Sequence, residues 1–200
     1  MKVVVATRNR GKLVEIVDLL GGAGALELVT IDDVAPAAVL REDEDTFEGN
    51  ALAKARQAAA ATGLPAIADD SGLEVDALAG APGVWSARYA GEPSDDGRNN
   101  AKLLEALRDV PAEQRQARFR CAAAFVDGAR ALVIVESGAC EGRILEAPRG
   151  SGGFGYDPLF LVPPVDKTMA ELPLAQKNQL SHRAAAFRAL AAALRARGIG

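Results

Sequence analysis

Histidine and cysteine are scarce in this sequence, which holds one His and two Cys among 200 residues. Structural zinc is held by four Cys, His or acidic ligands, and the chain has no C-x-x-C pair and no second His. The composition therefore disfavours a zinc site. Cys121 and Cys140 lie apart, and Cys121 falls in an apolar strand pattern. We expect both to be unpaired thiols in a reducing compartment.

Long apolar runs are missing too, and so is an excess of positive charge. No run approaches the roughly 20 apolar residues of a membrane span, and the apolar stretch near the N-terminus is too short for a secretory signal. The net charge at pH 7 is −4, so no overall basic field favours nucleic acid. These absences predict a cytoplasmic protein without a membrane or nucleic-acid partner.

The pattern of apolar residues predicts one α/β domain over residues 1–200. The length and the 49% hydrophobic content suffice for a substantial core. Strands are expected at residues 2–6, 26–31, 66–68, 73–75 and 159–162, and a hairpin at 116–136. Helices are expected after Asn9, over residues 47–62 behind a Thr46 cap, after Ser94 or Asp95, and after Ser181. The first helix would bury Leu13, Ile16, Val17 and Leu20. This order favours a mixed sheet.

The most informative stretch covers residues 66–91, where an apolar run ends in Asp69 and Asp70. Side chains alternate along a strand, so a strand that stops here directs one acid to each face. Buried charges are costly unless they are paired or bind a cation. A turn at Asp-Asp-Ser-Gly is the plainer interpretation. Glycine and proline crowd the residues that follow, and a second acidic run, residues 42–45, precedes a helix. Together they indicate a magnesium site that handles phosphate.

Residues 7–12 lie between the first strand and the first helix. Such a turn presents free backbone N–H groups and the positive end of the helix dipole, which suit a phosphate. Lys12 would add a mobile charge, and Thr7 and Asn9 would add short polar contacts. The segment is not a Walker A loop, which needs G-x-x-x-x-G-K-S/T. A solvated helix start is the alternative.

A glycine-rich loop at residues 150–157 contains Phe154 and Tyr156, in a chain with only six Phe and two Tyr. Phe154 could stack on a base, or it could be buried in the core. Lys177, His182 and Arg183 follow, and they offer several hydrogen-bond donors in a short span. Recognition of a carbonyl-bearing base edge requires such donors.

Six motifs in one order and spacing give the chain a family resemblance that runs from Val3 to the last helix. They are Thr7-x-Asn9-x-x-Lys12, Thr46-Phe47-x-x-Asn50-Ala51, Ala68-Asp69-Asp70-Ser71-Gly72-Leu73, Gly80-x-Pro82-Gly83-x-x-Ser86-Ala87-Arg88, Gly152-Gly153-Phe154-Gly155-Tyr156-Asp157-Pro158 and Ser181-His182-Arg183. The set resembles the inosine/xanthosine triphosphate pyrophosphatase family. Related sequences often carry Glu just before the helix asparagine, where this chain has Gly49.

The resemblance implies a role for each matching residue. Asp70 would be the catalytic base and a magnesium ligand, with Glu42 as the second acid. The substrate-binding residues would be Thr7, Arg8, Asn9, Arg10, Gly11, Lys12, Lys54, Ser71, Phe154, Gly155, Tyr156, Asp157, Lys177, His182 and Arg183. The resemblance also implies a two-lobed α/β fold with an elongated mixed sheet flanked by helices, an active-site cleft between the lobes, and a homodimer.

These features predict Mg²⁺-dependent hydrolysis of deaminated purine nucleoside triphosphates, namely ITP, dITP and XTP, to the monophosphate and pyrophosphate. A non-catalytic nucleotide sensor is the main alternative, but it would not need the Asp69–Asp70 pair. A nucleic-acid-binding module fits poorly with the net charge of −4.

Overall fold

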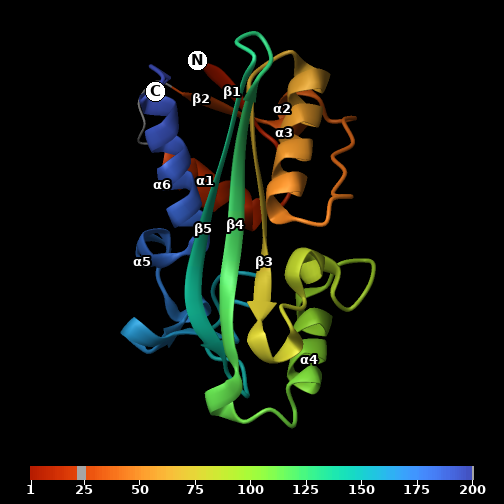
Figure 1. The fold of residues 1–200 in the computed structure, drawn as a ribbon, viewed down its shortest axis with the longest axis vertical. Coiled ribbons are helices and arrows are strands. Elements are labelled where there is room, and N and C mark those ends of the chain that lie inside the picture. Colours follow the sequence, from red (N-terminus) through yellow and green to blue (C-terminus); the bar gives the residue numbers. More distant parts are fainter. Residues whose placement is uncertain (22–25, 200) are drawn as a thin grey trace. The chain divides into compact units, whose positions relative to one another are not determined.

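The computed structural model describes residues 1–21 and 26–199 and contains one mixed sheet. Its strands are β1 (Lys2–Val5), β2 (Glu27–Thr30), β3 (Ala66–Val75), β4 (Gln116–Asp127), β5 (Leu132–Ile144), β6 (Phe160–Val162) and β7 (Lys167–Thr168). They lie in the order β2-β1-β3-β4-β5-β6-β7 (Figure 1). β1 pairs in parallel with β2 and β3, and β6 pairs antiparallel with β5 and β7. The predicted α/β class with a mixed sheet is confirmed.

The helices among the described residues are α1 (Arg10–Gly21), α2 (Ile31–Val34), α3 (Phe47–Thr62), α4 (Asp96–Ala106), α5 (Leu174–Leu180) and α6 (His182–Arg195). The bounds of α3 follow from its sequence. Thr46 accepts a hydrogen bond from the Gly49 N–H at 3.0 Å, and Gly63 ends the helix in a left-handed conformation with φ of 68°. No helix in the described part of the chain is long and apolar enough to cross a membrane.

The chain divides into two compact units, each made of separate segments. Unit 1 comprises Met1–Asp70, Cys121–Gly138 and His182–Gly200, and unit 2 comprises Ser71–Arg120 and Ala139–Ser181. The division falls inside β3, β4 and β5, so these three strands contribute residues to both units. The cleft expected between two lobes stays a prediction.

Unit 1 has its own apolar core around the N-terminal strands. α1 and α6 pack against each other on one face of the sheet, and α3 lies on the other face (Figure 1). The core includes Val3, Val5, Ile67, Phe125 and Phe187. The last helix buries Phe187, Leu190 and Leu194, as its periodicity predicts, and Ala191 is partly buried.

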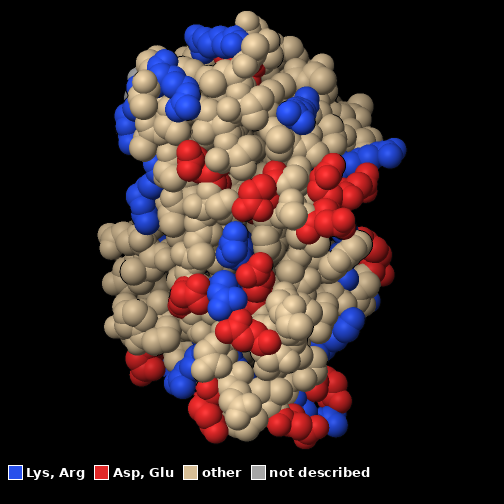
Figure 2. Space-filling view, in the orientation of Figure 1, with Lys and Arg blue, Asp and Glu red and all other residues tan. Residues whose placement is uncertain are grey.

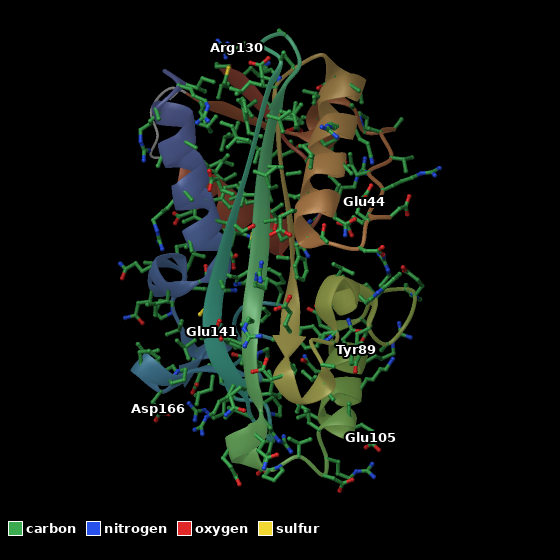
Figure 3. The ribbon with its side chains drawn as sticks, viewed as in Figure 1. Glu44, Tyr89, Glu105, Arg130, Glu141 and Asp166 are labelled. Atoms are coloured by element: carbon green, nitrogen blue, oxygen red, sulfur yellow. The ribbon has the colours of Figure 1, made fainter. Side chains whose placement is uncertain are left out.

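Unit 2 is built around a second core, in which the rings of Phe119 and Phe160 lie 4.4 Å apart. α4 contributes Leu103 to this core, and Leu107, the residue that follows the helix, is also buried in it. At its outer surface Lys102 Nζ lies 4.4 Å from the centre of the Tyr89 ring, and Figure 3 shows Tyr89 beside α4.

The surface of unit 2 carries opposite charges side by side. Arg118 on β4 forms ion pairs with Asp76 at 2.9 Å, Glu141 at 3.1 Å and Glu74 at 3.9 Å. Blue and red side chains alternate in this part of the face seen in Figure 2. Arg118 is half-buried, but Asp76 and Glu141 are exposed, so these pairs add little stability.

Two expectations about local structure are wrong. β3 continues without a turn through Asp69, Asp70, Ser71 and Gly72, so residues 73–75 are not a separate strand. In α1, Ile16 and Leu20 are buried but Val17 is 44% exposed, and Glu15 is buried instead. Ion pairs satisfy the acids in β3 and the glutamate in α1, so burial does not require apolar side chains at these positions.

Candidate functional site

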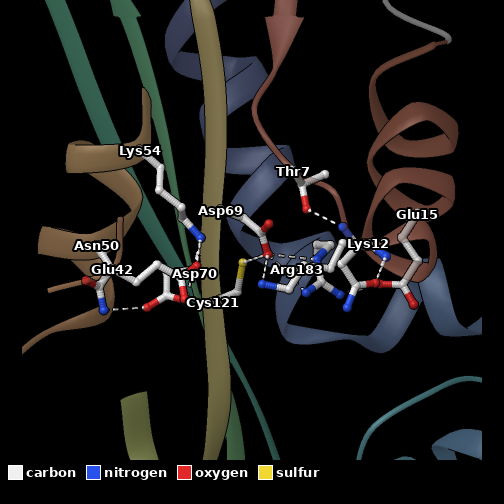
Figure 4. Close-up of polar contacts among 11 residues, drawn as sticks. Thr7, Lys12, Glu15, Glu42, Asn50, Lys54, Asp69, Asp70, Cys121 and Arg183 are labelled. Carbon is white, nitrogen blue, oxygen red and sulfur yellow. Dashed lines mark hydrogen bonds and ion pairs between the residues drawn. The ribbon is translucent and has the colours of Figure 1, made fainter. Parts of the chain in front are cut away.

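β3 directs Asp69 and Asp70 to opposite faces, and each carboxylate meets a lysine (Figure 4). Asp69 Oδ2 lies 3.4 Å from Lys12 Nζ, and Asp70 Oδ1 lies 3.8 Å from Lys54 Nζ. Both acids are buried, with Asp69 fully inaccessible and Asp70 5% exposed. The predicted alternation of the two acids is confirmed, although the strand does not stop there.

Lys54 joins Asp70 to the second acid predicted for a metal, Glu42. Its Nζ donates a short hydrogen bond to Glu42 Oε1 and also faces Asp70 Oδ1. Asn50, one turn earlier on α3, donates from Nδ2 to Asp70 Oδ2 at 3.0 Å. The Asn50 amide is held in turn, because its Oδ1 accepts from the Glu44 N–H at 2.9 Å. α3 thus positions both groups that fix the Asp70 carboxylate.

The pKa values of the two acids in this cluster, Asp70 and Glu42, are shifted in opposite directions. Burial favours the neutral form of Asp70, and the nearby Glu42 adds to this, so the pKa of Asp70 lies above 3.8 in spite of Lys54 and Lys12. Burial would also raise the pKa of Glu42, but Lys54 holds it below its ordinary value of 4.5. The upward shift of the Asp70 pKa is in the direction that suits a proton acceptor, and the shift of Glu42 is in the opposite direction.

Glu42 and Asp70 have the donor chemistry that Mg²⁺ requires. Mg²⁺ takes oxygen ligands and is usually held by one or two carboxylates, several waters and the phosphates of a substrate. Both carboxylates face the same ammonium group of Lys54. Among the described residues there is no group of three or more His, Cys, Asp or Glu side chains that could hold a metal by themselves. A metal held by Glu42 and Asp70 would therefore take its remaining ligands from water and from the phosphates of a substrate.

On the opposite face of β3, Asp69 is part of a buried charge chain formed by Lys12, Asp69, Arg183 and Glu15. Arg183 donates from Nε and Nη2 to Asp69 Oδ2 at 3.1 and 3.0 Å, and from Nη1 to Glu15 Oε2. Burial would raise the pKa of Asp69, but Lys12 and Arg183 hold it well below 3.8. Burial and the charge of Asp69 both raise the pKa of the neighbouring Cys121 thiol. Cys121 and Cys140 are both free.

The predicted phosphate loop begins α1. The Lys12 N–H donates to Asn9 Oδ1 at 3.0 Å, as at a capped helix start, and the Asn9 N–H donates to Thr7 Oγ1 at 3.2 Å. Arg8 turns away to Asp32, at 2.8 Å, and to the carbonyls of residues 36 and 38. Arg10 and Gly11 form the first turn of α1.

In unit 2 the predicted base-binding loop is held together by Asp157. Its Oδ2 accepts hydrogen bonds from the Phe154 N–H at 2.9 Å and from Lys177 Nζ at 2.5 Å. Lys177 Nζ also lies 4.8 Å from the centre of the Phe154 ring. Phe154 is half-buried, whereas Tyr156 is buried and donates from its hydroxyl to the Ser86 carbonyl at 2.9 Å.

The predicted residues therefore form groups within each unit. In unit 1, Glu42, Lys54 and Asp70 meet on one face of β3, and Lys12 and Arg183 meet on the other. In unit 2, Phe154, Asp157 and Lys177 meet, and Ser71 follows Asp70 in β3. His182 begins α6 in unit 1 and is buried.

Sequence reasoning gave no role to Asn50 or Glu15. Asn50 stands inside a quoted motif, and Glu15 lies one helical turn beyond Lys12, the spacing at which helical side chains share a face.

The fold and these clusters define the class: an α/β protein with a mixed sheet, in which two acids on one strand each face a lysine from a helix. The comparisons identify the family, because the model of the Ham1 family matches residues 3–193. The chain belongs to the Ham1 family.

Named relatives and solved structures agree with this assignment. The chain is 54% identical over 187 residues to a dITP/XTP pyrophosphatase of Geobacter sulfurreducens, covering 93% of this chain and 92% of the relative. It is 52% identical over 188 residues to one of Desulforamulus reducens, covering 94% and 92%. The structure of the Staphylococcus aureus Ham1 protein matches with a TM-score of 0.87 and 40% identity, covering 98% of this chain and 100% of that one.

Proposed function

We propose that this protein hydrolyses deaminated purine nucleoside triphosphates, namely ITP, dITP and XTP, to the monophosphate and pyrophosphate, with Mg²⁺ as cofactor. The observation that carries the proposal is the pair of acids on β3, each facing a lysine on its own side of the strand. Relatives at 52–54% identity are named dITP/XTP pyrophosphatases, which supports the substrate class.

In this proposal Asp70 takes the proton of the attacking water. The water oxygen forms a bond to phosphorus, the bridging P–O bond between the α- and β-phosphoryl groups breaks, and pyrophosphate leaves. Burial raises the pKa of Asp70, which is the direction that suits a proton acceptor. Asn50 keeps the other carboxylate oxygen in place, so Asp70 presents a fixed lone pair.

Charge on the phosphates is offset by the residues around Asp70. Glu42 and Asp70 would hold Mg²⁺, which when bound polarises the phosphoryl oxygens. Lys54 stays cationic, because Asp69, Glu42 and Asp70 raise its pKa against the effect of burial. Lys12, with the N–H groups at the start of α1, would contact the phosphate tail.

The base would contact the loop of unit 2. Phe154 offers a ring face, and Lys177, held by Asp157, offers a donor to a keto oxygen. Contacts of His182 and Arg183 with the base, a cytoplasmic location and a homodimeric state remain predictions.

Pyrophosphate release from ITP, XTP, GTP and ATP tests this proposal, measured with Mg²⁺ and after its removal with a chelator. We expect release from ITP and XTP that needs Mg²⁺. Release of inorganic phosphate in place of pyrophosphate, or equal rates with and without Mg²⁺, would overturn the proposed reaction or its cofactor. Binding of ITP without turnover would favour the nucleotide sensor.

A further inference from the structure

We propose that Asp96 and Asn100 on α4 are positioning residues for base recognition, because together they fix the backbone N–H and carbonyl of Gly155, the residue after Phe154. This inference rests on the proposed function and concerns the way in which unit 2 presents Phe154 to a base. All the residues it uses belong to unit 2.

The two side chains hold both backbone groups of one glycine. The Gly155 N–H donates to Asp96 Oδ2 at 2.6 Å, and the Gly155 carbonyl accepts from Asn100 Nδ2 at 2.9 Å. Asp96 and Asn100 are four residues apart on α4, so their side chains share a face of the helix. Gly155 has a φ of +60°, which glycine adopts without strain, and glycine would be mobile without such restraints.

Phe154 is consequently held through the peptide groups on both its sides. Its own N–H donates to Asp157 Oδ2 at 2.9 Å, and its carbonyl accepts from the Asp157 N–H at 3.2 Å. Asp96 then fixes the N–H of the next residue, Gly155. The backbone at Phe154 is therefore held in place, so the ring extends from a fixed position before substrate arrives.

These two contacts are not needed to anchor α4. Asp95 caps the helix by accepting from the Arg98 N–H at 2.7 Å, and Leu103 and Leu107 are buried in the core of unit 2. Asn99 ties the helix to the preceding segment, with bonds to the Ala90 N–H at 2.7 Å and the Ala87 carbonyl at 3.0 Å. The contacts with Gly155 are additional to these.

The side-chain amide of Asn100 is also less favourable for packing than an apolar side chain would be. Its Oδ1 is buried and has no hydrogen-bond partner among the described residues. A buried polar atom without a partner destabilises a protein, so an apolar side chain of similar size would serve packing better. The interaction that an apolar side chain could not make is the hydrogen bond from Asn100 Nδ2 to the Gly155 carbonyl.

The test compares Asp96→Ala with Asp95→Ala. Both remove an acid from the start of α4, but only Asp96 contacts Gly155. We measure the Kd of IMP without metal, KM and kcat for ITP, and the ratio of kcat/KM for ITP over ATP. Loss of a hydrogen bond to a charged group predicts, for Asp96→Ala, about tenfold weaker IMP binding and a similar rise in KM. We expect kcat to change little, and Asp95→Ala to keep wild-type Kd and KM.

Two further variants keep the test decisive if Asp96→Ala folds poorly. Asp96→Asn retains an acceptor for the Gly155 N–H and should restore most of the IMP affinity. Asn100→Leu removes the donor together with the unpartnered oxygen, so it should weaken IMP binding without lowering the melting temperature.

Equal effects of Asp96→Ala and Asp95→Ala, or wild-type IMP affinity in both Asp96→Ala and Asn100→Leu, would overturn the inference. If either outcome occurs while the wild-type protein releases pyrophosphate from ITP, the proposed function still holds. Failure of the wild-type protein to hydrolyse ITP would instead refute the proposed function.

Discussion

Asp70 and Asp69 are adjacent in the chain, but their surroundings give them different chemistry. Burial raises the pKa of Asp70, whereas Lys12 and Arg183 lower that of Asp69. Asp70 therefore has the properties of a proton acceptor, and Asp69 those of a permanent anion that holds two cations. The family resemblance assigned the catalytic role to Asp70, but the pattern of two identical residues side by side could not by itself separate these roles.

Asp70→Asn should reduce turnover of ITP by at least about 10²-fold, the lower range for the loss of a general base. The amide has nearly the same shape, so the melting temperature and the affinity for nucleotide should change little. Steady-state kinetics with Mg²⁺, together with thermal denaturation, check this. Turnover close to that of the wild type would contradict the assignment of Asp70.

Asp69→Asn should act on stability, because it leaves the buried Arg183 with fewer negative partners. Removal of one partner from a buried ion pair costs about 3–5 kcal/mol of unfolding free energy at neutral pH. The folded-state pKa of Asp69 lies below the ordinary value of 3.8, so its contribution is present above pH 3.8 and is lost as pH falls further. Denaturant titrations should show a wild-type advantage that is constant near pH 7 and shrinks below pH 3.8. An advantage that grows on acidification would contradict this interpretation.

Lys12→Ala should weaken binding of ITP by about tenfold, the size expected for a charge-assisted contact, and weaken IMP binding less. The reason is that Lys12 stands at the start of α1, where it would contact the phosphate tail and not the base. Lys2→Ala is the matched control, since Lys2 is exposed and pairs with the exposed Glu27 at 3.7 Å. Affinities for ITP and IMP that fall by the same factor would place Lys12 elsewhere.

β5 packs closely against α6 because Gly138 has no side chain. An added Cβ at Gly138 would lie 2.5 Å from the Ala186 nitrogen and closer still to the His182 carbonyl oxygen, both in the backbone of α6. Gly138→Ala should therefore push the start of α6 away from β5 and cost about 1–3 kcal/mol of unfolding free energy. Gly128→Ala, in the same hairpin but with nothing within 4 Å, should leave the free energy nearly unchanged. Denaturant unfolding of both variants checks this contrast.

The elements with local signals were predictable from the sequence. Thr46 and Gly63 mark the ends of α3, Asp95 caps α4, and Thr168 with Glu171 forms a capping box. These are interactions between residues close in the chain, so the sequence displays them directly.

Elements that depend on distant partners were not predictable. The pattern Asp-Asp-Ser-Gly is typical of a turn, yet it continues as strand because cations from α1, α3 and α6 neutralise its acids. Glu15 is buried for the same reason, since its partner Arg183 lies 168 positions further along the chain. The residues of the candidate site were indicated by the family resemblance, whereas the contacts that orient them became visible only in the fold.

For the molecule as a whole, we predict a preference for ITP over ATP in kcat/KM of roughly 10⁴-fold. A keto oxygen at position 6 can accept from a donor such as Lys177, whereas the amino group of adenine would leave that donor unpaired. Phe154→Ala should lower kcat/KM for both nucleotides and change their ratio only mildly, because stacking is common to all purines. Comparable values for ATP and ITP in the wild-type protein would contradict this account of base choice while leaving the phosphate chemistry standing.

During synthesis on the ribosome, the first segment of unit 1 emerges before either segment of unit 2, and its last segment, which contains α6, emerges after both. Its segments Met1–Asp70, Cys121–Gly138 and His182–Gly200 are separated by the two segments of unit 2. Until α6 leaves the exit tunnel, Glu15 and Asp69 lack Arg183, and the apolar side of α1 lacks its helical partner. Pairing over such distances is slow, and exposed apolar surface in the meantime invites aggregation. Residues 1–70 therefore lack part of their own unit, and expose apolar surface that chaperones can bind, until the residues of α6 have been synthesised.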